Sequence, residues 1–321
     1  MSAVASSPRA PRIAVRHEII LAAILIVALI GLGFANDRFL TLDNLLNQGR
    51  LMTEIGLIAL PMTFVIITGG IDVSVGAIVG LCAIALGYSW KNLGFPLPLA
   101  IVFSLGVGAA AGFANGFVIT RIKVPAIITT IATLTLFRGL AEGISQAHSV
   151  RGYPEWFYFL GQGDVFGVPT QLLILLIAIV AFGVALDRTS FGRTLYAIGS
   201  NETAARFSAL PVDRVKLAAY TLSGLTSGLS AFVLVSRVTT TRSDMGMGYE
   251  LDAIAAVVLG GTSIFGGSGT IWGTVIGLVM IQLLKNGLAL TGVKGDATIM
   301  VIGIVLIASV LIASSLQRRR E

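Results

Sequence analysis

Polar and ionisable side chains inside otherwise apolar stretches are the residues of this sequence whose types could do chemistry. Asp72 follows a pair of glycines, and the hydroxyl groups of Thr68 and Ser74 flank it. Two glycines allow a helix to break, and unwound backbone at membrane depth is tolerated where it lines a watery cavity. This arrangement suits hydrogen bonding to a polyhydroxylated solute, although Asp72 could equally cap a helix that begins near Val73.

Four other polar residues lie in apolar stretches. Arg138 and Glu142 are four residues apart, so they are expected to pair on one helical face and neutralise each other. Asn115 and Gln282 are uncharged, and such groups more often hydrogen-bond between helices than bind a ligand. As the candidate substrate pathway we take Thr68, Asp72, Ser74 and Asn115.

The sequence lacks the motifs of the common catalytic sites. It contains no G-x-x-x-x-G-K-[ST] and no Gly-Lys pair, so it has no nucleotide-binding P-loop. H-E-x-x-H and G-x-S-x-G are also absent. The single cysteine, Cys82, excludes an internal disulfide, and His17 and His148 lie in different regions and form no metal pair. We expect no catalytic residue, metal site or cofactor in this chain.

Composition places the chain in the membrane. Hydrophobic residues make up 55% of the 321 and charged residues only 12%, with a mean hydropathy of +0.90. A soluble domain carries about 25% charged residues. We therefore predict an all-α polytopic membrane protein. The net charge of +6 is attributed to loops that set orientation in the bilayer, not to a nucleic-acid partner.

About ten apolar segments follow one another along the chain. The eighth is too short to cross alone, so it is either broken by two glycines after position 259 or extended to Phe265. Glu250 and Asp252 are expected at its outer mouth. The segments cover approximately residues 19–35, 45–68, 77–88, 97–120, 126–145, 171–186, 217–236, 250–259, 269–290 and 297–316.

Ten crossings make one domain, residues 18–316, with both termini in the cytoplasm. A disordered N-terminal segment, residues 1–17, and a short C-terminal tail, residues 317–321, flank it. With the N-terminus inside, thirteen of the twenty-two Lys and Arg residues fall in cytoplasmic segments. That bias agrees with the positive-inside rule.

The longest polar stretch between apolar runs is the central loop, residues 187–216, which this orientation places in the cytoplasm. Asn201 can cap a short helix that runs through Arg206 toward Leu210, and Pro211 prevents its continuation. A short capped helix on a basic loop has the features of a docking surface. An ordinary charged loop is the alternative.

Small residues recur every fourth position in two places, which on a helix makes a smooth stripe that lets two backbones approach closely. Tight packing of helices is the favoured interpretation, and direct contact with substrate is the alternative. The glycines concerned are Gly108, Gly112 and Gly116, and then Gly269, Gly273 and Gly277.

Four motifs together resemble the permease subunits of ribose-type monosaccharide ATP-binding cassette (ABC) importers, and the resemblance extends from about residue 39 to 310. Relatives carry ribose, xylose, arabinose, rhamnose or autoinducer-2, and the last two branches look most similar. The motifs are GGIDVSVG from Gly69, AIGSNE from Ala197, YELDAIAAVVLGGTS from Tyr249 and GGSGTIWGT from Gly266.

The resemblance implies partners and a role for the central loop. A cytoplasmic ATPase would hold ATP and Mg²⁺, a second permease, identical or similar, would complete the pathway, and a periplasmic binding protein would deliver the sugar. One departure is visible, since Ser208-Ala209 stands where relatives often have Ser-Gly. The loop would dock on the ATPase through Gly199, Asn201, Glu202, Ala204, Ala205, Ser208 and Pro211.

The expected function is therefore that of a permease subunit of a bacterial inner-membrane importer, working by alternating access. The chief alternative is an ion-coupled secondary sugar carrier that uses Asp72, Glu142 or Asp252. A channel is a further alternative. An intramembrane enzyme is disfavoured because the sequence shows no nucleophile–base pair and no metal ligand set.

Overall fold

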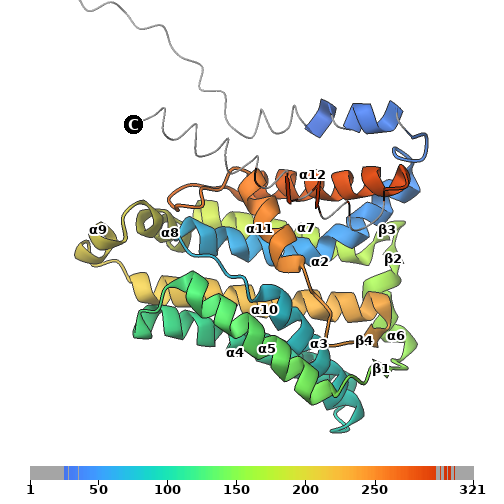
Figure 1. The fold of residues 1–321 in the computed structure, drawn as a ribbon, viewed down its shortest axis with the longest axis horizontal. Helices are drawn as coiled ribbons and strands as arrows, with labels where there is room; N and C mark the ends of the chain where they lie inside the picture. Colours follow the sequence, from blue (N-terminus) through green and yellow to red (C-terminus); the bar gives the residue numbers. More distant parts are fainter. Residues whose placement is uncertain are drawn as a thin grey trace, which may run out of the picture.

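The computed structural model describes residues 25–27, 29–34 and 36–293, together with positions 297, 300, 301, 303, 304 and 307 (Figure 1). The predicted N-terminal segment 1–17 and C-terminal tail 317–321 lie outside the described residues. So do the beginning of the first apolar segment and most of the tenth. The predicted positions of the two termini therefore stay predictions.

Among the described residues, six helices are long and apolar enough to cross a membrane, and two further apolar helices, Leu25–Phe34 and α3 (Val75–Lys91), are shorter. The prediction of an all-α polytopic membrane protein is confirmed, while the number ten is not established. The six are α2 (Leu42–Ile67), α4 (Leu97–Phe117) with the π-helical turn η1 (Val118–Ile122), α5 (Ala126–Ser145), α7 (Thr170–Arg188), α10 (Val212–Val238) and α12 (Ile271–Leu290).

The remaining elements are short and, apart from α11 (Tyr249–Leu259), gather at the two ends of the bundle. In Figure 1, α8 and α9 lie at one end, while α6 and the four strands lie at the opposite end. Strands β1 and β4 pair antiparallel, as do β2 and β3. These elements are α6 (Glu155–Gln162), α8 (Ser190–Ser200), α9 (Glu202–Phe207), α11 (Tyr249–Leu259), β1 (Val150–Arg151), β2 (Asp164–Val165), β3 (Val168–Pro169) and β4 (Thr240–Thr241).

Helices α2 and α10 form the centre of the bundle. In their most apolar stretches 83% and 72% of the residues are buried, against 22–33% in α4 with η1, α5 and α7. The outer helices therefore present apolar side chains such as Val102, Ile128 and Ile177 away from the protein. Lipid can solvate such surfaces, whereas water cannot.

Each central helix is followed by an extended segment and a short helix. Residues 68–74 lead from α2 to α3, and residues 239–248 lead from α10 to α11. Figure 1 shows both short helices beginning in the middle of the bundle and running toward opposite ends. Helix α11 ends at Leu259 and is followed by a turn at Gly260 and Gly261, so the eighth apolar segment is broken there, one of the two alternatives from the sequence.

Glycines let α4 approach α10 closely. A Cβ atom on Gly108 or Gly112 would collide with a backbone carbonyl of α10, that of Gly224 or Tyr220, and one on Gly116 would press against Leu217. Interfaces of this kind are common between membrane helices, because small residues allow van der Waals contact between backbones.

The second glycine series is arranged differently from the expected helical stripe. Gly273 and Gly277 of α12 pack against the backbones of Gly260 and Ala256. Gly269 lies before α12 begins, with φ of +158°, and a Cβ there would meet the side chain of Thr262. It therefore belongs to the loop and not to a stripe on the helix.

Candidate functional site

The break between α2 and α3 carries Asp72 deep into the bundle. Gly69 has φ of +77°, a left-handed conformation that ends α2 and turns the chain back. The Asp72 carboxylate accepts a hydrogen bond from Ser223, which lies eleven residues after the start of α10. Eleven residues of helix span about 16 Å. Three of the first five side chains of α10 are charged, so its apolar part begins near position 217, six residues before Ser223, and Asp72 lies roughly a third of the way into a hydrocarbon core of ~30 Å.

Asp72 is the centre of a buried polar cluster. Its Oδ1 accepts hydrogen bonds from the backbone N–H and the hydroxyl of Ser74, at 3.1 and 2.6 Å. Asn115 donates its Nδ2 to the Ser74 hydroxyl at 2.8 Å, and Ser223 donates to Asp72 Oδ2 at 3.2 Å. All four side chains are fully buried. None of these partners of Asp72 is a cation.

Two buried polar atoms beside this cluster have no hydrogen-bond partner among the described residues: Asn115 Oδ1 and the hydroxyl of Tyr220. Gly70 is required here, because a Cβ on it would collide with the Tyr220 hydroxyl. Unmade hydrogen bonds of buried groups are costly. The cluster therefore has spare capacity to bind a polar solute or water.

Three of the four predicted pathway residues come together, and the fourth does not join them. Thr68 donates to the carbonyl of Val65 at the end of its own helix. Helix α3 begins at Val75, two residues later than the capping alternative placed it, with Ser74 as its N-cap. Sequence reasoning missed Ser223 and Tyr220, although hydroxyl groups at positions 223, 227 and 230 form a polar series in an apolar run.

The start of α11 meets the start of α3. Gly76 in the first turn of α3 leaves no room for a side chain, because Glu250 and the carbonyl of Gly246 lie against it. Arg138 of α5 donates to the carbonyls of Ser243 and of Met245 on the segment before α11, the latter at 3.1 Å. It also donates to the carbonyl of Gly76 at 3.3 Å. Arg138 thus joins the two segments.

This arrangement corrects one prediction and leaves another open. Arg138 does not form the expected pair with Glu142, whose side chain is exposed, because backbone carbonyls from distant segments occupy the guanidinium. Glu250 and Asp252 lie in the first turn of α11, and their predicted place at the outer mouth of that segment stays a prediction. Tyr249 beside them donates to Glu54, which lies one helical turn beyond Arg50 in α2.

Glu54 and Arg237 form an ion pair that the sequence did not indicate. Arg237 near the end of α10 donates its Nε and Nη2 to the two carboxylate oxygens of Glu54, at 2.6 and 3.0 Å. Glu54 is 1% exposed, so the pair is shielded from solvent. Lys285 and Asp252 make a second pair, between α12 and α11, at 2.5 Å. The first pair holds the two central helices to each other, and the second holds α11 to α12.

The polar loop of the sequence folds mainly into α8 and α9, and residues 190–207 are called the coupling segment here after the role that the resemblance implies. Asn201 caps α9, since its Oδ1 accepts from the N–H of Ala204 at 2.9 Å. Ala205 is buried against the bundle, while Phe207 at the end of α9 is 88% exposed. Figure 1 shows α9 extending beyond the ends of the long helices. Aromatic residues, Phe among them, are enriched in the cores of protein–protein interfaces.

Ionic contacts fix α9 to the start of α10. Glu202 accepts from Arg206 at 2.8 Å and from Lys216 at 2.6 Å, and Arg206 also pairs with Asp213 at 2.6 Å. Burial alone would raise the pKa of Glu202, but the hydrogen bonds from Lys216 and Arg206 outweigh it and hold that pKa below its ordinary value. Glu202 is therefore ionised at neutral pH.

The turn after α9 carries the departure noted in the sequence. Ser208 ends the helix and is exposed, and Ala209 has φ of +57°, a left-handed conformation that favours glycine. Pro211 is the N-cap of α10. Replacing the usual Gly by Ala is therefore not neutral here, because it leaves strain in the turn.

Gly199 joins the coupling segment to two other chain segments. A Cβ on Gly199 would collide with the carbonyl oxygen of Ile67 and the backbone nitrogen of Gly267. The N–H of Gly267 donates to that same carbonyl at 2.9 Å, and Tyr196 of α8 donates to the carbonyl of Gly269 at 2.7 Å. We call this contact of α8, the end of α2 and residues 263–269 the backbone junction.

The described residues contain no group of three or more His, Cys, Asp or Glu side chains that could hold a metal ion. The site is therefore a set of buried hydrogen-bonding groups and helix ends. Such a set can bind and release a neutral polar solute, and the break in the helices allows segments to shift.

Comparison with known proteins gives one family. A family model described as branched-chain amino acid transport system / permease component matches residues 44–310. The chain is 39% identical over 316 residues to the autoinducer 2 import system permease protein LsrD of Escherichia coli O9:H4 (strain HS), covering 97% of this chain and 95% of that relative. The proteins of that name from Escherichia coli (strain K12) and Shigella flexneri match with the same identity and coverage. No solved structure matches the chain.

Proposed function

The chain belongs to this permease family, which includes the ribose-type sugar ABC permeases it resembles, and from that premise we propose that it moves a small sugar-like solute inward under the control of a separate ATPase. The family is a permease component of a transport system and not a catalytic enzyme. The chain is a multi-pass membrane protein. Its place in this proposal is the bacterial inner membrane.

The observation that carries the proposal beyond the family is the backbone junction. The coupling segment ends in the exposed Phe207, yet its Gly199 lies in backbone contact with Ile67, at the end of the central helix α2. A protein that binds α9 would therefore act on the segment that leads to Asp72. An ordinary surface loop would not need such a contact.

The proposed mechanism is alternating access driven through that junction. ATP binding closes the ATPase dimer and displaces α9, and α8 transmits the displacement to residues 67–70 and 263–269. The first segment leads to Asp72 and α3, and the second leads to α12. Since Asp72, Ser74 and Asn115 are buried in this arrangement, a helix shift has to expose them before solute passes.

The proposed assembly contains partners that supply what this chain lacks. A cytoplasmic ABC ATPase holds ATP and Mg²⁺ and contacts the coupling segment through Asn201, Glu202, Ala204 and Ser208, with Ala205 and Pro211 shaping the helix and its end. A second permease, identical or similar, completes the pathway in the bilayer. A periplasmic binding protein delivers the solute at the opposite face.

The relatives named autoinducer 2 import system permease suggest the class of solute. The chemistry of the polar cluster suits a neutral, hydroxyl-rich molecule. The cluster offers hydroxyls, one amide and one carboxylate, and the groups that hydrogen-bond to Asp72 are uncharged. A rhamnose-like or autoinducer-2-like solute is therefore the proposed cargo.

An ion-coupled secondary carrier is the second candidate, and the buried Asp72 favours it, because a carboxylate without a cationic partner can take up a proton or ion. Uptake of labelled solute into cells separates the two. The proposal predicts that uptake stops when ATP is depleted at constant membrane potential, and that it continues when an ionophore collapses the gradients while ATP is maintained. The reverse pattern would establish the carrier.

A further inference from the structure

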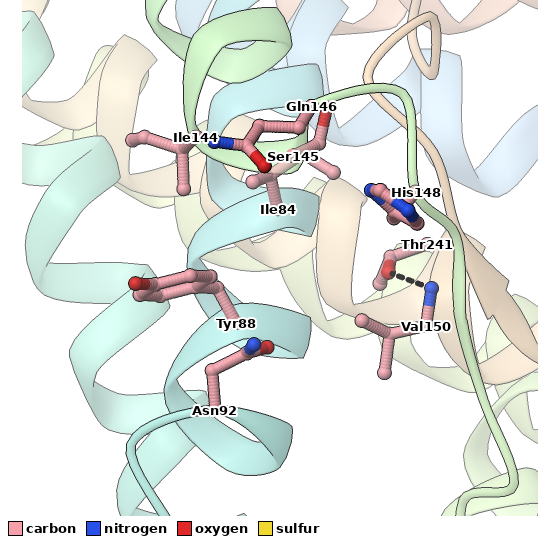
Figure 2. Close-up of a pocket in the computed structure, with 9 residues that line it drawn as sticks. All are labelled: Ile84, Tyr88, Asn92, Ile144, Ser145, Gln146, His148, Val150 and Thr241. Atoms are coloured by element: carbon pink, nitrogen blue, oxygen red, sulfur yellow. Dashed lines mark hydrogen bonds between the residues drawn. The ribbon is translucent and has the colours of Figure 1, made fainter.

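A pocket of about 270 Å³ opens between the end of α3, the end of α5 and the paired strands β1 and β4 (Figure 2). It lies at the end of the bundle opposite the coupling segment. We propose that this pocket binds a small, neutral, polyhydroxylated solute before the solute reaches the buried cluster at Asp72. The inference rests on the proposed function, because inward transport decides from which face of the membrane the solute arrives.

The lining chemistry identifies the ligand class. None of the lining residues is an Asp, Glu, Lys or Arg, so the pocket offers no full counter-charge to an ionic ligand. It offers instead hydroxyl and amide groups that both donate and accept hydrogen bonds, as the hydroxyls of a sugar require. These groups belong to Tyr88, Asn92, Ser145, Gln146 and Thr241, and His148 adds an imidazole.

The pocket also has an apolar side. Ile84 and Ile144 line it together with the ring of Tyr88, which is 38% exposed. A sugar ring has an apolar C–H face that packs on such surfaces while its hydroxyls reach polar groups. Sites for drug-sized ligands enclose about 300–1,000 Å³. A pocket of about 270 Å³ therefore suits a smaller solute such as a monosaccharide.

Contacts between segments hold the walls of the pocket together. Val150 of β1 and Thr241 of β4 are directly paired, and the Val150 N–H also donates to the Thr241 hydroxyl at 3.3 Å. Tyr153 stacks on Trp90 with ring centroids 4.5 Å apart, which fixes the chain beyond β1 to α3. Preformed walls reduce the entropy lost on binding.

The loop after α5 places polar groups at the pocket in a strained conformation. Gln146 and Ala147 both have positive φ, +46° and +61°. Figure 2 shows Gln146 and His148 on this loop facing Tyr88 of α3 and Asn92, the residue after α3, across the open space. Two adjacent non-glycine residues in this region cost free energy, and such strain is typical of functional loops.

Ligand-observed saturation-transfer NMR on the purified full-length chain in nanodiscs tests the inference. D-Ribose and L-rhamnose are the probes, and zwitterionic L-leucine is the comparison ligand. We expect both sugars to bind and L-leucine to give no signal. Tyr88→Phe removes one hydroxyl and Gln146→Gly removes one amide while accepting the positive φ. Each should weaken sugar binding by about three- to tenfold.

Tyr158→Phe is the matched control, since Tyr158 lies at the same end of the bundle on α6 but does not line the pocket. It should bind the sugars as the unmodified chain does. Thermal midpoints of all variants show that they are folded. Absence of sugar binding by the unmodified chain, equal binding by the pocket variants, or preference for L-leucine each overturns the inference.

Retention of an ATPase subunit by the same samples separates this inference from the proposed function. Sugar binding that depends on Tyr88 in a chain that retains no ATPase would support the pocket and refute the ABC assignment. Retention of the ATPase without sugar binding at the pocket would support the ABC assignment and refute the pocket.

Discussion

Gly199 of the coupling segment leaves no space for a side chain between its backbone and the carbonyl oxygen of Ile67 at the end of α2. Helix α8 therefore rests directly on the segment that leads to Asp72. Backbone contact of this kind transmits displacement well, because no flexible side chain lies between the two segments.

Gly199→Ala should abolish ATP-driven uptake. The added methyl overlaps the carbonyl of Ile67 and the amide of Gly267, so α8 has to move away from the backbone junction. Gly183→Ala in α7 is the matched control, because nothing lies within 4 Å of a Cβ at that position. Uptake and the amount of protein in the membrane are measured together. Normal uptake by Gly199→Ala would refute the transmission role.

Ala209→Gly should stabilise the turn after α9. Ala209 has φ of +57°, where a Cβ costs about 1 kcal/mol, partly offset by the greater freedom of glycine in the unfolded chain. Ala204→Gly, inside α9, should instead destabilise by about 1 kcal/mol. Hydrogen exchange of residues 202–211 measures both effects as changes in local opening. Faster exchange in Ala209→Gly would show that the turn is not strained.

Removing one partner of the pair between Glu54 and Arg237 should be strongly destabilising. Arg237→Met leaves a buried carboxylate without its cation, at a cost of about 3–5 kcal/mol, and the double variant with Glu54→Gln should recover much of that loss. Arg242→Ala removes the exposed pair with Asp244 and should cost at most about 1 kcal/mol. Thermal midpoints in nanodiscs rank the variants. Equal losses of thermal stability in Arg237→Met and Arg242→Ala would contradict the role of the buried pair.

Docking of α9 on α10 should weaken in acid. The pKa of Glu202 in the folded protein lies below its ordinary value. The contribution of Glu202 to the free energy of docking is therefore fully present above the pKa in the unfolded chain, about 4.3. That contribution is lost as the pH falls through the lower folded pKa. Glu202→Gln should therefore expose α9 to protease at neutral pH and reduce the acid dependence, and the pair of Arg206 with Asp213, whose pKa is also lowered, accounts for what remains. Identical pH profiles for the two proteins would assign the effect to another group.

The sequence predicted the fold class and the position of Asp72 through local signals. Long apolar runs specify membrane helices, and two glycines before a carboxylate mark a broken helix. The partners of Asp72 could not be predicted with it. Ser223 lies 151 residues away, and only the packing of α10 on the break brings its hydroxyl to the carboxylate.

Local spacing also misled where distant segments compete. Four-residue spacing predicts that Arg138 pairs with Glu142, which is wrong, because the carbonyls of residues 243–245 fold into reach of the guanidinium. The partnership of Glu54 with Arg237 joins α2 and α10 across 183 positions and leaves no local pattern. Phe207 was missed because one aromatic residue in a polar loop is unremarkable until its exposure is known.

The most direct test of the central claim is to purify the tagged chain gently from native membranes and identify what accompanies it. Phe207→Ala is compared with Phe166→Ala, since both rings are exposed but Phe166 lies in the turn between β2 and β3, at the other end of the bundle. We predict that an ABC ATPase accompanies the unmodified chain and Phe166→Ala, and is reduced at least about tenfold in Phe207→Ala. Equal retention by Phe207→Ala would contradict docking through α9, and a chain that emerges without an ATPase from several mild detergents would contradict the ABC assignment itself.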